Sequence, residues 1–244
     1  MGYLRASFIM TLCILLVTSS AWADKSATIE RIGDYNAQSI NLKTTRQDCQ
    51  VGNLNAPALA ISDWFVGIES YKFLFDPAAT CDCTIGFDLQ SVHVFMQFGP
   101  EDVPAAFVAN VDLAEAVWDN ASGCWVPGPE VCTSPVSSIT IDTEGLYDIG
   151  LPIAGDCACA EMGFLYLLSC HFTTAFPTGM EPDAVTDDLP TPCTSWYDFG
   201  AGWQDLVVDF GWPGNIIMIG DVVCCEFPVE SESNSWGGVK SLYR

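Results

Sequence analysis

The sequence has few basic residues, with 8 lysines and arginines against 31 aspartates and glutamates in 244 residues. The formal net charge of -23 repels the phosphates of nucleic acids and anionic membrane surfaces, so neither is expected as a partner. The chain also has no run of roughly 18 apolar residues, the length that a membrane span needs. Half of the residues are hydrophobic, which is unlike an intrinsically disordered chain. These absences leave an acidic globular protein.

Motifs of the common catalytic classes are also missing. The sequence has no G-x-S-x-G nucleophile elbow, H-E-x-x-H zinc site or P-loop, and it lacks the C-x2-C spacing of zinc-thiolate sites. A serine or cysteine mechanism would have to use His93 or His171, the two histidines of the chain. Paired carboxylates for glycoside hydrolysis stay open, because so many acidic residues always offer pairs. We therefore name no catalytic residue and expect a protein that is not an enzyme.

The first 23 residues are typical of a signal peptide. Arg5 precedes the apolar run 6–17, and the small residues that end at Ala23 resemble an A-x-A cleavage site. Cleavage before Asp24 leaves 31 acidic and 7 basic residues, a net charge of -24. The sequence thus predicts an exported protein that is secreted or held at the cell surface.

The remaining charges are unevenly distributed. No lysine or arginine occurs between Lys72 and Lys240, although that stretch holds 25 acidic residues. Such uncompensated charge destabilises a compact fold unless salt screens it or cations bind. Calcium (Ca2+) is the natural candidate outside a cell, because it prefers carboxylate and carbonyl oxygens. The alternative is a solvated acidic surface in a saline habitat, since no EF-hand spacing is present.

The cysteines predict a disulfide framework, as expected in an oxidising compartment. Eleven follow the signal peptide: Cys49, Cys81, Cys83, Cys124, Cys132, Cys157, Cys159, Cys170, Cys193, Cys224 and Cys225. We predict a bond between Cys124 and Cys132, which flank a Pro- and Gly-rich loop, and leave the other partners open. In extended strands, Cys81 and Cys83 would share a face, whereas Cys224 and Cys225 would face opposite sides and bond to different partners. The odd total leaves at least one thiol outside an internal bond, and we expect Cys170 to be a disulfide cysteine and not a nucleophile.

The chain divides by composition into a polar arm or edge element at 24–60, a core domain at 61–229, and a linker with a tail at 230–244. Short apolar segments recur through the core domain between Pro, Gly, Asp and Asn clusters, which predicts an all-β fold. The expected strands are 64–75, 84–90, 91–98, 105–111, 138–142, 147–151, 163–172, 205–210 and 215–224. Residues 111–118 could instead form two turns of helix. The number of expected strands favours a two-sheet antiparallel sandwich, jelly-roll-like and reinforced by disulfides.

Aromatic residues gather between positions 196 and 212, interleaved with aspartates and glycines. Flat rings beside carboxylates suit a sugar, because the ring stacks on the apolar sugar face while the acids accept hydrogen bonds from hydroxyls. The candidate ligand-binding residues are Trp196, Tyr197, Asp198, Trp203, Asp205 and Trp212. The alternative is that these rings are core residues of the sandwich.

The C-terminal nine residues, Trp236 to Arg244, follow a Ser- and Glu-rich linker and carry Lys240 and Arg244. This tail resembles that of uncharacterised secreted bacterial proteins that end in W-G-x-[IV]-K-x-L-[FY]-R. The segments Gly200 to Leu206 and Asp221 to Cys225 are similar to β-sandwich domains of the same group. The resemblance implies secretion without implying an activity. The spacing of Trp236, Val239 and Tyr243 gives the tail a small apolar face, which suits an address or attachment signal that engages a sorting or attachment partner. The alternative is a frayed terminus.

Three functions follow from these observations. The first is a secreted or cell-surface structural or adhesive β-sandwich without catalysis. The second is a carbohydrate-binding module for a neutral polysaccharide, supported by calcium. The third is a glycosidase-type hydrolase, which requires two carboxylates that face each other across a cleft.

Overall fold

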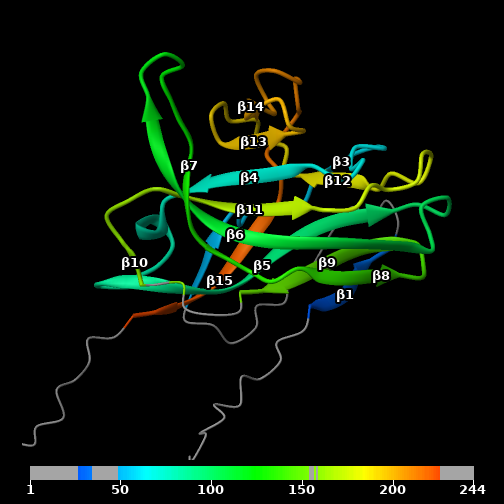
Figure 1. The fold of residues 1–244 in the computed structure, drawn as a ribbon, viewed down its shortest axis with the longest axis horizontal. Coiled ribbons are helices and arrows are strands. Elements are labelled where there is room, and N and C mark those ends of the chain that lie inside the picture. Colours follow the sequence, from blue (N-terminus) through cyan, green and yellow to red (C-terminus); the bar gives the residue numbers. More distant parts are fainter. Residues whose placement is uncertain (1–26, 35–48, 154–156, 158, 226–244) are drawn as a thin grey trace, which may run out of the picture.

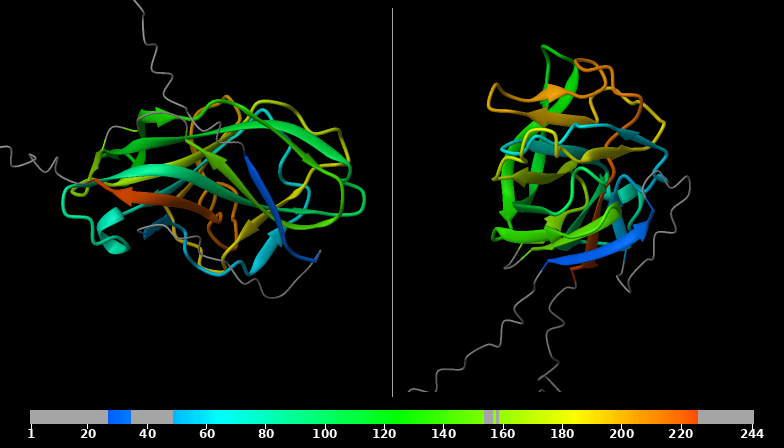
Figure 2. Two further views of the ribbon diagram at one scale, coloured as in Figure 1. Left: turned by 90° about the horizontal axis from the view of Figure 1, so that it is seen from below. Right: turned by 90° about the vertical axis from the view of Figure 1, so that its right-hand side faces the viewer.

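The computed structural model describes residues 27–34, 49–153, 157 and 159–225, which fold into two layers of antiparallel strands (Figures 1 and 2). This arrangement confirms the predicted disulfide-reinforced, two-sheet all-β sandwich. The expected signal peptide, linker and tail lie outside the described residues, as do residues 24–26 and 35–48 of the expected arm.

The first sheet has eight strands built around the long strand β5. Its members are β1 (Thr28–Gly33), β2 (Cys49–Gly52), β3 (Leu59–Ile61), β5 (Gly86–Phe98), β9 (Gly145–Pro152), β10 (Ala160–Glu161), β12 (Asp183–Thr186) and β15 (Met218–Cys224). Strands β9 and β10 pair with β5 along one side, while β15 and β12 pair with the other side. The described parts of the expected arm, β1, β2 and most of β3, are outer strands of this sheet.

The second sheet has seven strands in the order β14-β13-β4-β11-β6-β7, with β8 also paired to β6. They are β4 (Ser70–Phe75), β6 (Ala105–Asp119), β7 (Cys124–Thr133), β8 (Ser137–Ile141), β11 (Tyr166–Phe172), β13 (Ser195–Asp198) and β14 (Gln204–Asp205). A single 3-10 turn at Pro77–Ala79 is the helical element of the described chain.

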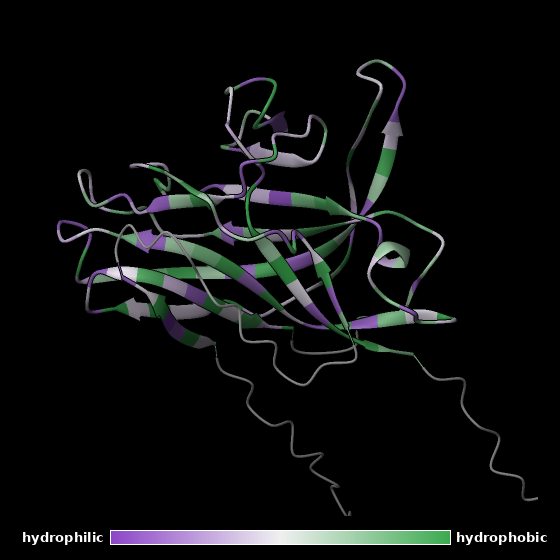
Figure 3. Ribbon diagram, turned by 180° about the vertical axis from the view of Figure 1, so that it is seen from behind, coloured by the Kyte–Doolittle hydropathy of each residue, from purple (hydrophilic) through white to green (hydrophobic). Residues whose placement is uncertain are grey.

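The main core lies between the sheets and is built by alternation along the strands. In β5, Val92, Val94 and Met96 are buried in this core, and His93 faces the opposite side, as the pattern predicted. Hydropathy alternates along several strands (Figure 3). The continuous apolar run near residue 217 has a different cause: its residues divide between the main core and a second cluster around Phe95 on the outer side. That segment is therefore covered on both faces.

Several predicted elements have different limits in the structure. Residues 111–118 belong to strand β6 and not to a helix, because β11 and β7 pair along both of its sides. The segments 84–90 and 91–98 form one continuous strand, β5. The expected strand 205–210 is mostly a turn, in which the Asp205 carboxylate accepts hydrogen bonds from the amides of Val207 and Val208.

The described chain has five disulfides and differs from the predicted Cys124–Cys132 bond. The pairs are Cys49–Cys81, Cys83–Cys224, Cys124–Cys193, Cys132–Cys157 and Cys159–Cys225. The predicted bond is wrong because both cysteines lie in strand β7, where eight residues of extended chain hold them roughly 25 Å apart, and a disulfide needs about 6 Å between Cα atoms. The Pro- and Gly-rich segment is a bulged strand and not a loop.

The structure also tests the predictions made for the other cysteines. Cys224 and Cys225 bond to two different partners, as predicted. Cys81 and Cys83 lie before β5, outside any strand, and also bond to separate partners. Cys170 is a free thiol, so its prediction as a disulfide cysteine was wrong. It faces the core from β11, where burial raises its pKa, so it is not a thiolate nucleophile.

Candidate functional site

The side of the second sheet that faces away from the core carries a set of polar residues, which we call the outer polar face: Ser70, Lys72, Asp112, Ser169 and His171. Strand register brings them together, because Lys72 is directly opposite Ser169, and Ser169 is directly opposite Asp112 on the next strand. Directly paired residues share one face of a sheet. Ser70 and His171 form the adjacent row.

Asp112 is the centre of this face. Its Oδ1 accepts hydrogen bonds from Lys72 Nζ (3.2 Å) and from Ser169 Oγ (2.6 Å), and its Oδ2 is bonded to His171 Nε2. Burial alone would raise the pKa of Asp112, but the His171 hydrogen bond and the Lys72 charge lower it below its ordinary value. Asp112 is therefore a buried, ionised carboxylate.

His171 connects this buried centre to a more accessible row. Its Nδ1 lies 2.6 Å from Ser70 Oγ, on the ring side opposite Asp112. Asp198, Ser70, His171 and Asn110 are cross-strand neighbours, and each is partly exposed. The structure thus places a serine hydroxyl, an imidazole and a carboxylate in one hydrogen-bonded series.

Trp203 covers the Lys72 end of the face. The Lys72 Nζ lies 5.1 Å from the centroid of the Trp203 ring, within the range of a cation–π contact. The loop that carries this ring passes through Gly200 and Gly202, both at positive φ, where side chains other than glycine are strained. The Asp198 Oδ1 accepts hydrogen bonds from both glycine amides (2.7 and 2.9 Å), which fixes the loop.

The paired distal ends of β6 and β7, residues 116–127, form a hairpin that projects from the body of the sandwich (Figure 1). We call it the tryptophan hairpin. The Cys124–Cys193 disulfide ties its end to the segment before β13, although β7 and β13 are far apart in the strand order. Nearby on the outer face, Ala114 and Leu167 are fully buried. The disulfide therefore links the hairpin, at one edge of the second sheet, to the β13 side of the same sheet.

Trp118 and Trp125 are directly paired across this hairpin, with ring centroids 5.5 Å apart. They remain 46% and 37% exposed. Trp118 Nε1 donates to Asn120 Oδ1 (3.1 Å), and the Asp119 carboxylate accepts hydrogen bonds from the turn that follows. Two large rings are thus fixed in place while they stay open to solvent.

Some of the aromatic residues predicted to bind a ligand are buried, and others are partly exposed. Trp196 and Trp212 are only 5% and 3% exposed, so neither offers a ring face to a ligand in this conformation. Trp212 packs on Trp64 at 4.9 Å, and Tyr197 packs on Tyr71 at 5.3 Å. Trp203 is the partly exposed tryptophan of the predicted group.

The two predicted aspartates have local contacts. Asp198 stabilises the Trp203 loop, and Asp205 accepts the amide hydrogen of Cys193 and those of the following turn. Next to this region, burial raises the pKa of Glu69 to about 7. Ligand binding by Tyr197, Asp198, Trp203 and Asp205 remains a prediction.

The other histidine lies on the outer side of the first sheet. His93 Nδ1 is 2.7 Å from Asp148 Oδ1, and His93 Nε2 is 3.0 Å from Asp221 Oδ2. Burial disfavours the charged ring, but hydrogen bonds to both carboxylates raise the pKa of His93 to about 10. The three residues come from β5, β9 and β15, so His93 links three neighbouring strands as a cation.

The sequence analysis missed both Ser70 and the tryptophan hairpin. The signal for Ser70 is the alternation in Ser70–Phe75, where Ser70 and Lys72 share a side opposite Tyr71 and Phe73. The signal for the hairpin is the polar turn between Trp118 and Trp125, which reads as a hairpin once residues 111–118 are taken as a strand.

Residues 47–222 match the family model described as a domain of unknown function, DUF7451. This match spans both sheets and most of the chain. The chain belongs to the DUF7451 family. The comparison with curated proteins gives no match.

Among solved structures, this DUF7451 chain is similar to the cysteine protease and lectin-like domains of Cwp84, a surface layer associated protein of Clostridium difficile. The identity is 11%, the TM-score is 0.44, and the match covers 76% of this chain. It covers only 38% of that chain. A likeness at this level does not support an inference about activity or ligand.

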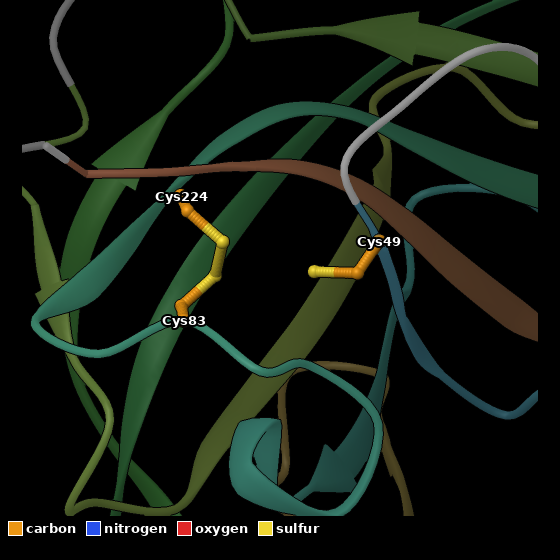
Figure 4. Close-up of side chains that lie close together, drawn as sticks. All are labelled: Cys49, Cys83 and Cys224. Atoms are coloured by element: carbon orange, nitrogen blue, oxygen red, sulfur yellow. A yellow bond between two sulfur atoms is a disulfide. The ribbon is translucent and has the colours of Figure 1, made fainter.

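One group of potential metal ligands occurs among the described residues, formed by the sulfurs of Cys49, Cys83 and Cys224 (Figure 4). These sulfurs belong to the Cys49–Cys81 and Cys83–Cys224 disulfides, so they are not thiolate ligands. Within the described ranges, no helix is long and apolar enough to cross a membrane.

Proposed function

We propose that the protein is an exported surface component, structural or adhesive, that binds a neutral saccharide through the tryptophan hairpin. The observation that carries the proposal is the pair Trp118 and Trp125, two exposed rings held by a disulfide-linked hairpin. Rings of this kind stack on the apolar faces of sugars, and preorganisation lowers the entropy cost of binding.

Export is supported by the cysteines. Ten of them form five disulfides, which are typical of proteins that fold in an oxidising compartment. The signal peptide at 1–23 and the attachment role of the tail at Trp236–Arg244 are part of this proposal.

The charge of the protein narrows the ligand class. Glu115 and Glu130 are exposed on the strands that carry the two rings, and the whole chain is strongly acidic. Nucleic acids and anionic polysaccharides are repelled by such a surface, whereas a neutral sugar is not. We therefore place neutral polysaccharides first among the ligands.

The test is affinity electrophoresis of the exported chain through gels that contain neutral polysaccharides, with calcium and with a chelator. We expect retardation that is lost in Trp118→Ala and Trp125→Ala and kept in Phe164→Ala, a matched exposed aromatic residue 58% exposed in the turn before β11. Equal retardation in all three variants would place binding elsewhere. Loss with the chelator would support the predicted calcium dependence.

A gel series with no retardation of the unmodified chain would contradict saccharide binding for the sugars tested. Trp203→Ala is included because Trp203 is the partly exposed tryptophan of the originally predicted group. No observation on the described residues favours the glycosidase hypothesis over binding. The expectation that the protein is not an enzyme remains a prediction.

A further inference from the structure

The structure builds a serine, a histidine and an aspartate into one hydrogen-bonded set around each of its two histidines. One set is Ser91, His93 and Asp221 on the first sheet, and the other is Ser70, His171 and Asp112 on the second. Their residue types are the same, but the second nitrogen of each ring meets a different group. This difference decides whether the ring can act as a base.

The ring of His93 has no free lone pair. Both nitrogens face carboxylates, at 2.7 Å from Asp148 and 3.0 Å from Asp221, and hydrogen bonds to them hold the ring as a cation. A protonated imidazole donates from both nitrogens. His93 therefore cannot accept a proton from Ser91, whose hydroxyl donates instead to Asp221 (3.1 Å).

The ring of His171 meets a carboxylate on one side only. Asp112 is ionised and accepts hydrogen bonds, so His171 Nε2 must carry the hydrogen that is shared with it. In the neutral ring, Nδ1 then has a lone pair and accepts the Ser70 hydroxyl hydrogen over 2.6 Å. This is the relation of nucleophile, base and orienting acid found in serine-type acyl transfer, with the two ring nitrogens exchanged.

The surroundings support this relation. The side chain of Asp112 is 2% exposed, and Lys72 and Ser169 hold it in place, so the orienting acid is buried and fixed. The side chain of His171 is 23% exposed, and Ser70 is partly exposed at the more accessible row of the outer polar face. A small molecule from solvent therefore reaches the serine end of the series and not the aspartate end.

We propose that Ser70 is a nucleophile toward small, uncharged carboxylic esters. Ser70 Oγ forms a bond to the ester carbonyl carbon while His171 Nδ1 takes the hydroxyl proton, and Asp112 stabilises the resulting imidazolium. The bond to the alkoxy oxygen then breaks, and His171 returns the proton to the departing alcohol. Water, deprotonated by the same nitrogen, releases the acid and restores the Ser70 hydroxyl. This activity is independent of saccharide binding by the tryptophan hairpin.

The test uses the exported chain, with its five disulfides formed, and a fluorophosphonate probe that labels activated serines. We expect mass spectrometry to place the label on Ser70 of the unmodified chain, a result that needs no variant. Ser70→Ala should abolish labelling and hydrolysis of p-nitrophenyl acetate above the background rate. Ser91→Ala, the matched serine beside His93, should leave both unchanged.

The role of His171 has its own readout. Because a general base contributes a factor of roughly 100 or more, His171→Gln should slow labelling by about that factor. Tryptophan fluorescence and the urea unfolding midpoint confirm that each variant is folded. A folded, unmodified chain that takes no label, or a label on another residue, overturns the proposal. A labelling rate that is unchanged in folded His171→Gln also overturns it.

Discussion

The two outer faces of the sandwich use histidine in opposite ways. On the first sheet, His93 lies between two carboxylates and links β5, β9 and β15 as a buried cation. On the second sheet, His171 lies between a carboxylate and a hydroxyl, and Lys72 is the cationic partner of Asp112. The comparison teaches that residue type does not decide the role of a histidine. The group on its second nitrogen does.

The largest effect expected from this comparison is on stability. His93→Ala leaves Asp148 and Asp221 without their shared cation, and removal of one partner from a buried ionic group costs about 3–5 kcal/mol. His171→Ala should cost less, about 1–3 kcal/mol, because Asp112 keeps Lys72 and Ser169. Urea unfolding at neutral pH measures both free energies. Equal losses would show that the two faces are not different in this respect.

A smaller effect is expected from pH. The pKa of His93 is raised from 6.5 to about 10, so its contribution to stability is complete below pH 6.5 and is lost as the pH rises through about 10. We expect the free energy of unfolding to fall by about 2 kcal/mol over this window, after allowance for the partial exposure of the ring. Urea titrations at several pH values should show the fall in the unmodified chain and in His171→Gln. The same fall in His93→Gln would rule out His93 as its source.

The smallest effect concerns the cover of the outer polar face. Trp203→Ala removes the cation–π contact to Lys72, which contributes about 1 kcal/mol. Trp118→Ala removes an exposed ring and should change stability less. Comparison of the two unfolding midpoints separates a ring that stabilises the second sheet from one that is available to a ligand. A larger loss of stability in Trp118→Ala than in Trp203→Ala would show that Trp118, and not Trp203, is the ring that stabilises the second sheet.

Local patterns in the sequence were sufficient to predict the fold class. Alternation around His93 correctly indicated a strand, and the apolar run from residue 215 correctly indicated a buried segment, of which Met218–Cys224 forms β15, because side-chain period and burial are local properties. The Cys124–Cys132 bond failed because strand continuity through a Pro- and Gly-rich segment depends on the pairing of β6 with β7. Pairing of that kind is not visible in a short window.

The sites were harder to predict than the fold. Ser70, Asp112 and His171 are separated by 42 and 59 residues in the chain, and only the register of β4, β11 and β6 brings them together. Trp212 is buried whereas Trp118 is exposed, although both are tryptophans next to acidic or glycine-rich segments. The sequence names the residue types, while cross-strand pairing decides which of them meet.

The adjacent cysteines at the end of β15 have a consequence for biogenesis. Cys224 bonds to Cys83 across 141 residues, and Cys225 bonds to Cys159 across 66. During synthesis from the N-terminus, Cys81 can bond to Cys49 as soon as it is made, whereas Cys83 must wait for nearly the whole domain before its partner is made. Until then, Cys83 is two positions from Cys81 in the chain and can form the wrong bond with Cys49. Correct oxidation of this protein therefore depends on the arrival of its last described strand, and a chain truncated before residue 224 would leave Cys83 and Cys159 without their disulfide partners.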